Sequence, residues 1–144
     1  MAFAEERDGF SGPEGSWLYT VTIQGLPSFQ GIETYSAGGG YSEADQLSFG
    51  SGSLASAGHG VWKSTSERKF ELTYLNLTFD GVPGNPTGTL KVRQTTTIDK
   101  AGNSYKGSGD YAYFDLNGAP MTFPGASGTF TIIATRIKLE APAK

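Results

Sequence analysis

Hydrophobic and polar side chains alternate along most of this chain, in short runs separated by glycine, proline and asparagine. Alternation with a period of two is typical of β-strands that bury one face. The pattern predicts eight strands, joined by turns in which Gly, Asn and Pro supply the backbone angles of a reversal. The predicted strands are Trp17–Gln24, Gly31–Ala37, Gln46–Phe49, His59–Thr65, Lys69–Phe79, Thr87–Asp99, Asn103–Leu116 and Gly128–Leu139.

The succession of these strands favours a closed barrel. They follow one another as hairpins with no helix between them, and an open sheet of such strands would expose its edges. Closure removes those edges, so we expect an all-β, eight-stranded, antiparallel up-and-down barrel. It would form a single domain over residues 1–144, with terminal tails at 1–12 and 141–144.

The Gly/Ser-rich tract between Ala37 and Gly60 fits the alternation least well. Within it, Tyr41–Leu47 has helix-like content, with Asp45 three residues after a capping Ser42, which favours a connector turn. Two alternatives stay open for the whole tract, a pair of short strands or a mobile flap. We interpret Ala37–Ser53 as a flap that would serve as a lid.

Alternation also assigns an inward and an outward face to each strand. In Thr87–Asp99 the charged residues mark the outside, which turns Gln94 inward. In Lys69–Phe79 the same test turns Tyr74 and Asn76 inward. It also leaves three apolar residues outward, which indicates either a bulge that shifts the register or a covering loop or partner subunit. These residues are Leu75, Leu77 and Phe79.

The predicted interior is aromatic and partly polar. A barrel of eight strands has room for side chains alone or for one small ligand, so a filled core and a cavity both stay open. Aromatic walls with a few polar groups suit a small hydrophobic or aromatic molecule, and we expect binding of such a molecule. The ligand-binding residues would be Tyr19, Trp62, Tyr74, Asn76, Gln94, Tyr111 and Tyr113.

A cofactor-independent cyclase or isomerase is the alternative function. Its candidate catalytic groups are Glu33, His59 and Tyr111. Burial would raise the pKa of Glu33 and prepare it for proton transfer, although most glutamates are exposed. His59 shares a face with the outward Lys63, so we expect it to face solvent while Trp62 points inward. A third possibility is a homo-oligomer that functions through its outer surface.

Composition excludes several other classes of function and of binding site. The chain lacks cysteine and has one histidine, which excludes disulfides and multi-histidine metal centres, and no motif predicts a metal or an organic cofactor. A net charge of -3 argues against nucleic-acid binding. Its apolar runs are far shorter than the roughly 20 residues of a membrane-spanning helix. We expect a soluble protein, either cytoplasmic or exported after removal of a signal.

One short motif and one basic residue of the chain resemble those of the calycin and lipocalin family. Gly15-Ser16-Trp17 resembles the Gly-x-Trp signature at the start of the first strand, and Arg136 stands where that family places a basic residue over the tryptophan. The resemblance implies a lipocalin-like barrel, closed at one end by contact between Trp17 and Arg136. Without cysteine, the chain is more similar to compact bacterial lipocalin-like or allene-oxide-cyclase-like barrels.

Overall fold

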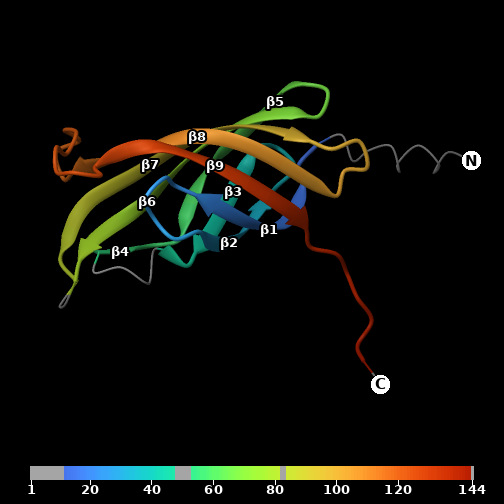
Figure 1. Ribbon diagram of the computed structural model, residues 1–144, viewed down its shortest axis with the longest axis horizontal. Helices are drawn as coiled ribbons and strands as arrows, with labels where there is room; N and C mark the ends of the chain where they lie inside the picture. The colour runs from blue at the N-terminus through green and yellow to red at the C-terminus, as the bar shows by residue number, and fades with distance from the viewer. Residues whose placement is uncertain (1–11, 48–52, 82–83, 144) are drawn as a thin grey trace, which may run out of the picture.

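A computed structural model of the chain describes residues 12–47, 53–81 and 84–143. Nine strands account for most of these residues (Figure 1). They are β1 (Gly15–Thr22), β2 (Phe29–Tyr35), β3 (Gly40–Asp45), β4 (Ser53–Ala55), β5 (Gly58–Ser66), β6 (Lys69–Asp80), β7 (Pro86–Ile98), β8 (Ser104–Asp115) and β9 (Ser127–Arg136).

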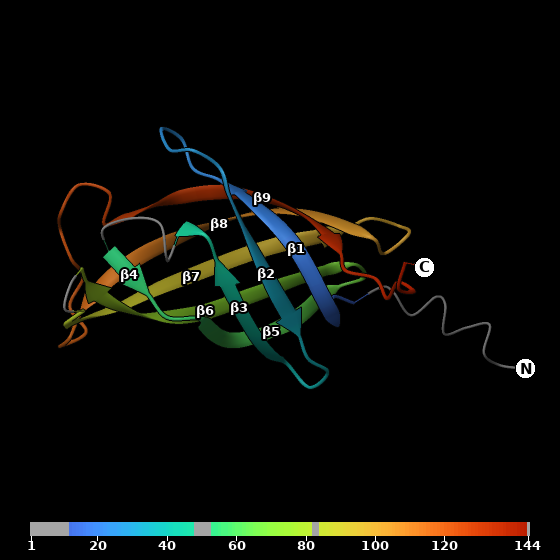
Figure 2. The ribbon, with the colours of Figure 1, turned by 90° about the horizontal axis from the view of Figure 1, so that it is seen from below.

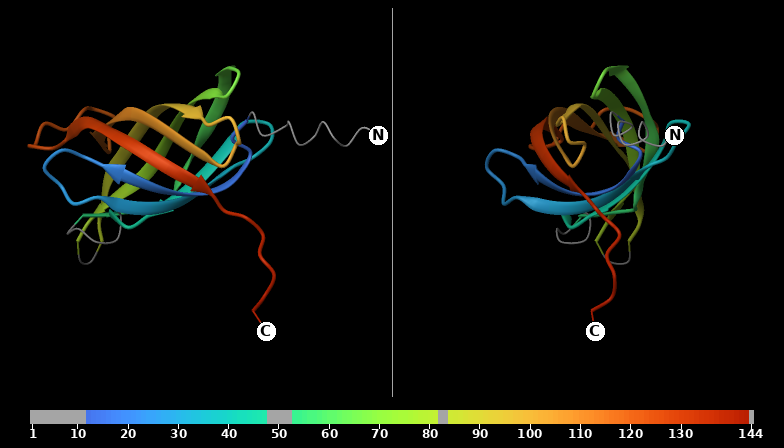
Figure 3. Two further views of the ribbon diagram at one scale, coloured as in Figure 1. Left: turned by 45° about the vertical axis from the view of Figure 1, so that its right-hand side comes forward. Right: turned by 90° about the vertical axis from the view of Figure 1, so that its right-hand side faces the viewer.

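The strands form one closed antiparallel barrel. Apart from the short β4, each strand pairs with the next along the chain, and β1 also pairs with β9, so the meander closes on itself. Viewed from the end, the strands surround a common axis (Figure 3, right). The closure leaves no long unpaired edge between the first and last strands. The predicted eight-stranded up-and-down barrel is therefore confirmed.

Nine strands make an eight-stranded barrel because β4 and β5 occupy one position. Both pair with β6, β4 with Thr78–Asp80 and β5 with Lys69–Leu75. Figure 2 shows β4 lying along the far end of β6. A break at Ser56 and Ala57 separates the two strands, and the backbone NH of Ser56 donates to the carbonyl of Leu77 across it. The two short strands thus act as one interrupted barrel strand.

The inward faces follow the predicted alternation on the long strands. Trp17, Tyr19 and Val21 of β1 are all buried in the core. On β7 Gln94 is buried too, and its amide donates a 2.9 Å hydrogen bond to the hydroxyl of Thr96. Every buried side-chain nitrogen and oxygen of the described residues has a hydrogen-bond partner. The polar interior is therefore an ordered part of the core.

Of the two alternatives for the Gly/Ser-rich tract, the structure has the pair of short strands, β3 and β4, and the interpretation of residues 40–45 as a turn and part of a flap was wrong. Residues 40–45 form β3, where a connector turn and a flap were expected, and β3 pairs with β2 and β5. Neighbouring strands and the buried contacts of Glu43 override the weak strand propensity of Ser-Glu-Ala-Asp. A strand was also expected at Gln46–Phe49. Its first two residues, Gln46 and Leu47, follow β3 and are not in a strand, and its last two lie outside the described ranges.

The outward leucines of β6 keep their predicted side. Pairing with β7 runs without a shift from Lys69 to Thr78, and the irregularity comes only before Phe79. Leu75 and Leu77 consequently face outward and are 44% and 57% exposed. A bulge does exist, but it lies too far along the strand to turn either leucine inward.

Trp17 and Arg136 close one end of the barrel, as expected. The guanidinium carbon of Arg136 lies 4.2 Å from the centroid of the Trp17 ring, within the roughly 6 Å range of a cation–π contact. Arg136 also donates to the backbone carbonyls of Gly102 and Glu14, while the indole NH of Trp17 donates to the carbonyl of Pro13 at 2.8 Å. Both side chains therefore tie neighbouring segments to this closed end.

In the part of the chain that the structure describes, no helix is long and apolar enough to cross a membrane.

Candidate functional site

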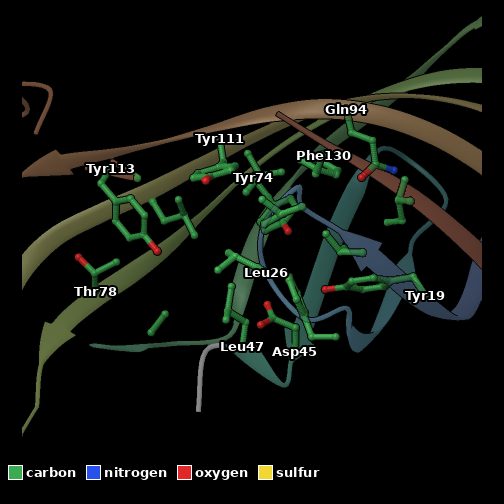
Figure 4. A pocket seen from close by; sticks show the side chains of 18 of the residues that line it. Tyr19, Leu26, Asp45, Leu47, Tyr74, Thr78, Gln94, Tyr111, Tyr113 and Phe130 are labelled. Atoms are coloured by element: carbon green, nitrogen blue, oxygen red, sulfur yellow. The ribbon is translucent and has the colours of Figure 1, made fainter. Parts of the chain in front are cut away.

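A cavity of about 270 Å³ occupies the half of the barrel away from the Trp17–Arg136 end. Its outer part is bounded by residues that follow β1 and β3 and precede β9, including Leu26, Leu47 and Gly125. In Figure 4, Tyr74, Tyr111 and Phe130 lie on one side of the cavity, with Leu47 and Asp45 opposite them. The barrel thus combines a filled core at one end with a cavity at the other.

The cavity wall is mostly apolar and aromatic, with a few polar groups. The polar and charged lining side chains are Tyr19, Tyr41, Asp45, Tyr74, Thr78, Gln94, Tyr111 and Tyr113. Among the described lining residues, Asp45 is the only Asp, Glu, Lys, Arg or His. A wall of this composition is typical of a site for a small organic molecule.

Five of the seven expected ligand-binding residues line the cavity: Tyr19, Tyr74, Gln94, Tyr111 and Tyr113. Two do not. Trp62 points inward as predicted, but it packs against Tyr35 and Phe70. Asn76 is fully buried, and its amide donates 2.8 Å hydrogen bonds to Glu43 and to the carbonyl of Ser56. Alternation gives the face of a residue but not its depth in the barrel, which places Trp62 away from the cavity. It does not give hydrogen-bond partners either, and Asn76, between the lining residues Tyr74 and Thr78 on β6, turns its amide to Glu43 and Ser56 behind the wall.

Glu43 lies buried just behind the cavity wall. Its Oε1 accepts a 2.5 Å hydrogen bond from the hydroxyl of Tyr19, and its Oε2 accepts from the amide of Asn76. Burial, and after it the interaction with Asp45, raises the pKa of Glu43 to about 8 against the opposing effect of the hydrogen bonds from Tyr19 and Asn76. Near neutral pH the carboxyl of Glu43 therefore holds its proton.

Asp45 connects this buried carboxyl to the cavity. It lies two residues further along β3, on the same face as Glu43, and its side chain is half-buried in the cavity wall. Its charge also reaches across the cavity: after burial, the charges of Glu43 and Asp45 contribute to the raised pKa of Tyr74, and that of Asp45 to the raised pKa of Tyr113. The carboxylate thus faces a group of tyrosine rings.

Glu33, a candidate catalytic residue, is buried in the closed half of the barrel. Its exposed fraction is 3%, although solvent exposure was the more usual expectation. It accepts hydrogen bonds from the hydroxyls of Tyr41 (2.8 Å), Tyr35 (3.2 Å) and Tyr105. Burial raises the pKa of Glu33 to about 7 against the opposing effect of these hydrogen bonds. Glu33 does not line the cavity, so these contacts connect strands within the core.

No family model, curated protein or solved structure matches this chain. The inferences about its site therefore rest on its own geometry.

The other two candidate catalytic residues lie on opposite sides of the barrel wall. His59 is exposed on the outer face, as expected from its alternation with Trp62. Tyr111 lines the cavity, and its ring packs edge-on against Tyr113 with 6.4 Å between centroids. The barrel wall therefore separates His59 from the cavity, and the structure does not bring the two residues together.

Glycines make room for the large inward side chains of the site. A Cβ atom at Gly31 would collide with the ring and hydroxyl of Tyr19, and one at Gly58 would lie 2.6 Å from Glu43 Oε2 and 2.7 Å from Tyr74. Alternation of small and large residues is how small barrels fit bulky interiors. These two glycines allow Tyr19 and Glu43 to meet across the intervening strand β2.

Sequence reasoning missed the contribution of β3. Tyr41, Glu43 and Asp45 all reach the interior, yet their segment was interpreted as a turn and a lid. The signal was present as a period of two, because these residues alternate with Ser42 and Ala44. Two acids among the three inward residues obscured it, since buried carboxylates are uncommon.

The acidic side chains do not gather into a metal site. Across residues 12–47, 53–81 and 84–143, no three His, Cys, Asp or Glu side chains lie close enough together to hold an ion.

Proposed function

We propose that this protein binds a small hydrophobic or aromatic molecule in the cavity of its barrel. The observation that carries the proposal is the cavity itself, about 270 Å³ in volume, with an apolar and aromatic wall. Binding pockets with mainly apolar walls and a few polar groups are the usual sites for small organic ligands.

The cavity volume limits the size of the ligand. An engineered apolar cavity of about 150 Å³ holds one benzene molecule. The present cavity, at about 270 Å³, is less than twice as large. It therefore suits a ligand of one or two fused rings, or an aliphatic molecule of similar bulk.

Polar groups on two sides of the cavity would orient this ligand. Gln94 and Tyr111 lie on β7 and β8, opposite Asp45 on β3. The amide NH₂ of Gln94 already donates to Thr96, which leaves its carbonyl oxygen as the group best suited to accept a hydrogen bond from a ligand. Tyr111 offers both a ring face and a hydroxyl.

The proposal can be tested with 1-naphthalenemethanol, a neutral two-ring probe. Isothermal titration calorimetry of the wild-type protein should give saturable binding at one site per chain. Gln94→Leu and Tyr111→Phe should weaken it several-fold while the fold is kept, and His59→Ala, on the outer face, is the matched control that should bind as the wild type does. Equal binding by all four proteins would place the probe outside the cavity.

Membership of the calycin or lipocalin family belongs to the same proposal. The stacking of Arg136 on Trp17 and the closed eight-stranded meander support it. Such a barrel holds its ligand at the open end, which here is the end that contains the cavity.

A cofactor-independent cyclase or isomerase is the second candidate, favoured by one observation. Glu43, whose pKa is raised to about 8, lies two residues before Asp45 on the same face of β3, and Asp45 lines the cavity, so a carboxyl that can donate a proton lies beside the ligand site. Native mass spectrometry of protein from its source would identify a retained ligand and also test the expected self-association. Incubated with that ligand, an isomerase forms a product of unchanged mass and altered retention time, and Glu43→Gln should abolish this product. A ligand that stays unchanged would leave binding as the function.

A further inference from the structure

We propose that the ligand of the cavity is a neutral carbonyl compound with an aromatic or apolar body, and that its carbonyl oxygen accepts hydrogen bonds from the hydroxyls of Tyr111 and Tyr113. This inference rests on the proposed binding function and narrows it to one functional group. Three features support it: two hydroxyls without a protein partner, their place in an apolar wall, and the absence of a cation among the described lining residues.

The first feature is the pair of hydroxyls on β8. Tyr111 and Tyr113 both line the cavity, yet neither hydroxyl has a hydrogen-bond partner within residues 12–47, 53–81 and 84–143. Every fully buried side-chain oxygen of these residues does have a partner, so the two hydroxyls are accessible from the cavity or its mouth. The other hydroxyls and the amide of the described wall are already hydrogen-bonded within the protein; they belong to Tyr19, Tyr41, Tyr74, Thr78 and Gln94.

A ligand that enters the cavity displaces water from these two hydroxyls. A hydroxyl proton left without an acceptor in a desolvated site costs free energy. Phenylalanine at either position would supply the same apolar wall without this cost. A carbonyl oxygen has two lone pairs and can accept from both tyrosines. The two hydroxyls therefore favour a ligand that places an acceptor beside β8.

The second feature is the fixed placement of both tyrosines in an apolar part of the wall. β8 pairs with β7 and β9, and the partners of Tyr111 and Tyr113 on β7 are Val92 and Leu90, which also line the cavity. The Tyr113 ring packs against Phe123 with 5.6 Å between centroids. Figure 4 shows Tyr111 and Tyr113 along one side of the cavity, with the hydroxyl of Tyr113 directed into it. Apolar surroundings strengthen hydrogen bonds from such hydroxyls.

A glycine makes room for the hydroxyl of Tyr111. Gly128 of β9 pairs with Tyr111, and a Cβ atom at Gly128 would lie 2.8 Å from the hydroxyl oxygen. The strand pairing and this glycine fix the position of the donor before a ligand arrives, which lowers the entropy cost of binding.

The third feature decides between a neutral carbonyl group and a carboxylate. The described lining residues include no Lys, Arg or His. A carboxylate buried without an opposite charge costs far more free energy than a neutral oxygen does. A ligand hydroxyl can accept as well, but its own proton would need a further acceptor. A ketone, aldehyde or ester satisfies both tyrosines and adds neither a donor nor a charge.

Two probes of the same shape test the carbonyl group. They are 1-acetylnaphthalene and 1-isopropenylnaphthalene, in which a CH₂ group replaces the carbonyl oxygen. Titration calorimetry gives the affinity of the wild type, Tyr111→Phe and Tyr113→Phe for each probe. Each substitution should weaken binding of the ketone about fivefold, the effect of losing one hydrogen bond, and change binding of the alkene by less than about twofold. His59→Ala, on the outer face, is the control and should change neither.

Infrared spectroscopy observes the proposed hydrogen bonds directly. The stretching band of a carbonyl group labelled with carbon-13 moves to lower frequency when its oxygen accepts a hydrogen bond. Bound to the wild-type protein, the ketone should show this band below its position in hexane, and each Tyr→Phe substitution should move the band back toward that position. Far-ultraviolet circular dichroism and the melting temperature show whether each variant is folded. If a variant does not fold, the wild-type spectrum still tests the inference.

The remaining outcomes separate this inference from the proposed function. A bound carbonyl band at its hexane position would show that neither tyrosine donates, and the inference fails. It also fails if either substitution leaves the ratio of ketone to alkene affinity unchanged, because both hydroxyls are proposed as donors, or if the ketone does not bind. In each of these cases binding of the alkene or of 1-naphthalenemethanol keeps the proposed function. If none of the three compounds binds the wild-type protein, the proposed function fails together with the inference.

Discussion

The hydroxyl of Tyr19 donates a 2.5 Å hydrogen bond to Oε1 of Glu43, and this bond joins β1 to β3 through the interior of the barrel. The two strands are not neighbours, since β2 lies between them. The Tyr19 ring reaches across β2 at Gly31, which pairs with Tyr19 on one side and with Asp45 on the other. A tyrosine, a glycine and a carboxyl from three strands therefore form one unit beside the cavity.

Tyr19→Phe should destabilise the protein by about 1–2 kcal/mol, because a buried carboxyl oxygen loses its donor. The pKa of Glu43 should rise further, since the bond from Tyr19 opposes the effect of burial. Urea denaturation at pH 7 measures the free energy of unfolding. Tyr113→Phe, which also loses a hydroxyl at the cavity wall but is only half-buried, is the matched control and should change stability by less than about 0.5 kcal/mol. Equal effects of both substitutions would argue against a structural role for the Tyr19–Glu43 bond.

Gly31→Ala should destabilise the barrel by about 1–3 kcal/mol, the cost of overpacking a filled interior. The added methyl group would overlap the ring and hydroxyl of Tyr19 and push it away from Glu43. Gly40→Ala is the control: its new Cβ would meet only Ser36, at 3.7 Å, an ordinary contact. Differential scanning calorimetry of the two variants should show a lowered melting temperature for Gly31→Ala alone.

Stability should fall as the pH rises from about 4.5 to 8. Burial raises the pKa of Glu33 to about 7 and that of Glu43 to about 8, from 4.5 in the unfolded chain. In this range the folded protein binds more protons than the unfolded chain, so each carboxyl contributes stability that is complete below pH 4.5 and lost as the pH rises through its folded pKa. For each of the two carboxyls, the free energy of unfolding should fall by on the order of 1 kcal/mol per pH unit.

Urea denaturation at several pH values measures this slope. Glu33→Gln and Glu43→Gln should each make it shallower, because each removes one titrating carboxyl from the core. Stability that rises between pH 5 and 8 would show that these carboxyls are ionised in the folded protein.

Trp17→Ala should cost about 3–5 kcal/mol, the range for removing a large buried aromatic side chain. The residue is fully buried, packs against Tyr105 with 4.9 Å between ring centroids, and lies under Arg136. Trp62→Ala, a half-buried tryptophan on β5, is the comparison and should cost less. A loss below about 1 kcal/mol for Trp17→Ala would mean that this end of the barrel does not depend on it.

The sequence by itself determined the class of fold and most of the inward faces. Long alternating runs with charges on one side, such as β7 with Arg93 outward and Gln94 inward, can be buried in only one way, since a slip by one residue would bury the charges. The contact between Trp17 and Arg136 was implied by the resemblance to the calycin and lipocalin family, and the pairing of β1 with β9 sets the two residues opposite each other.

Only the tertiary structure decided where each inward residue lies along the barrel axis and which acids are buried. Trp62 faces inward as predicted, yet it packs against the filled half, because depth depends on the stagger between strands, which no single strand encodes. Asn76 lies beside the cavity on β6, but its amide is bound by Glu43 and Ser56 behind the wall. β3 forms because its neighbours pair with it, and Glu43 is buried because Tyr19 and Asn76 satisfy it. These partners are 24 and 33 residues away in the chain, beyond the reach of any local pattern.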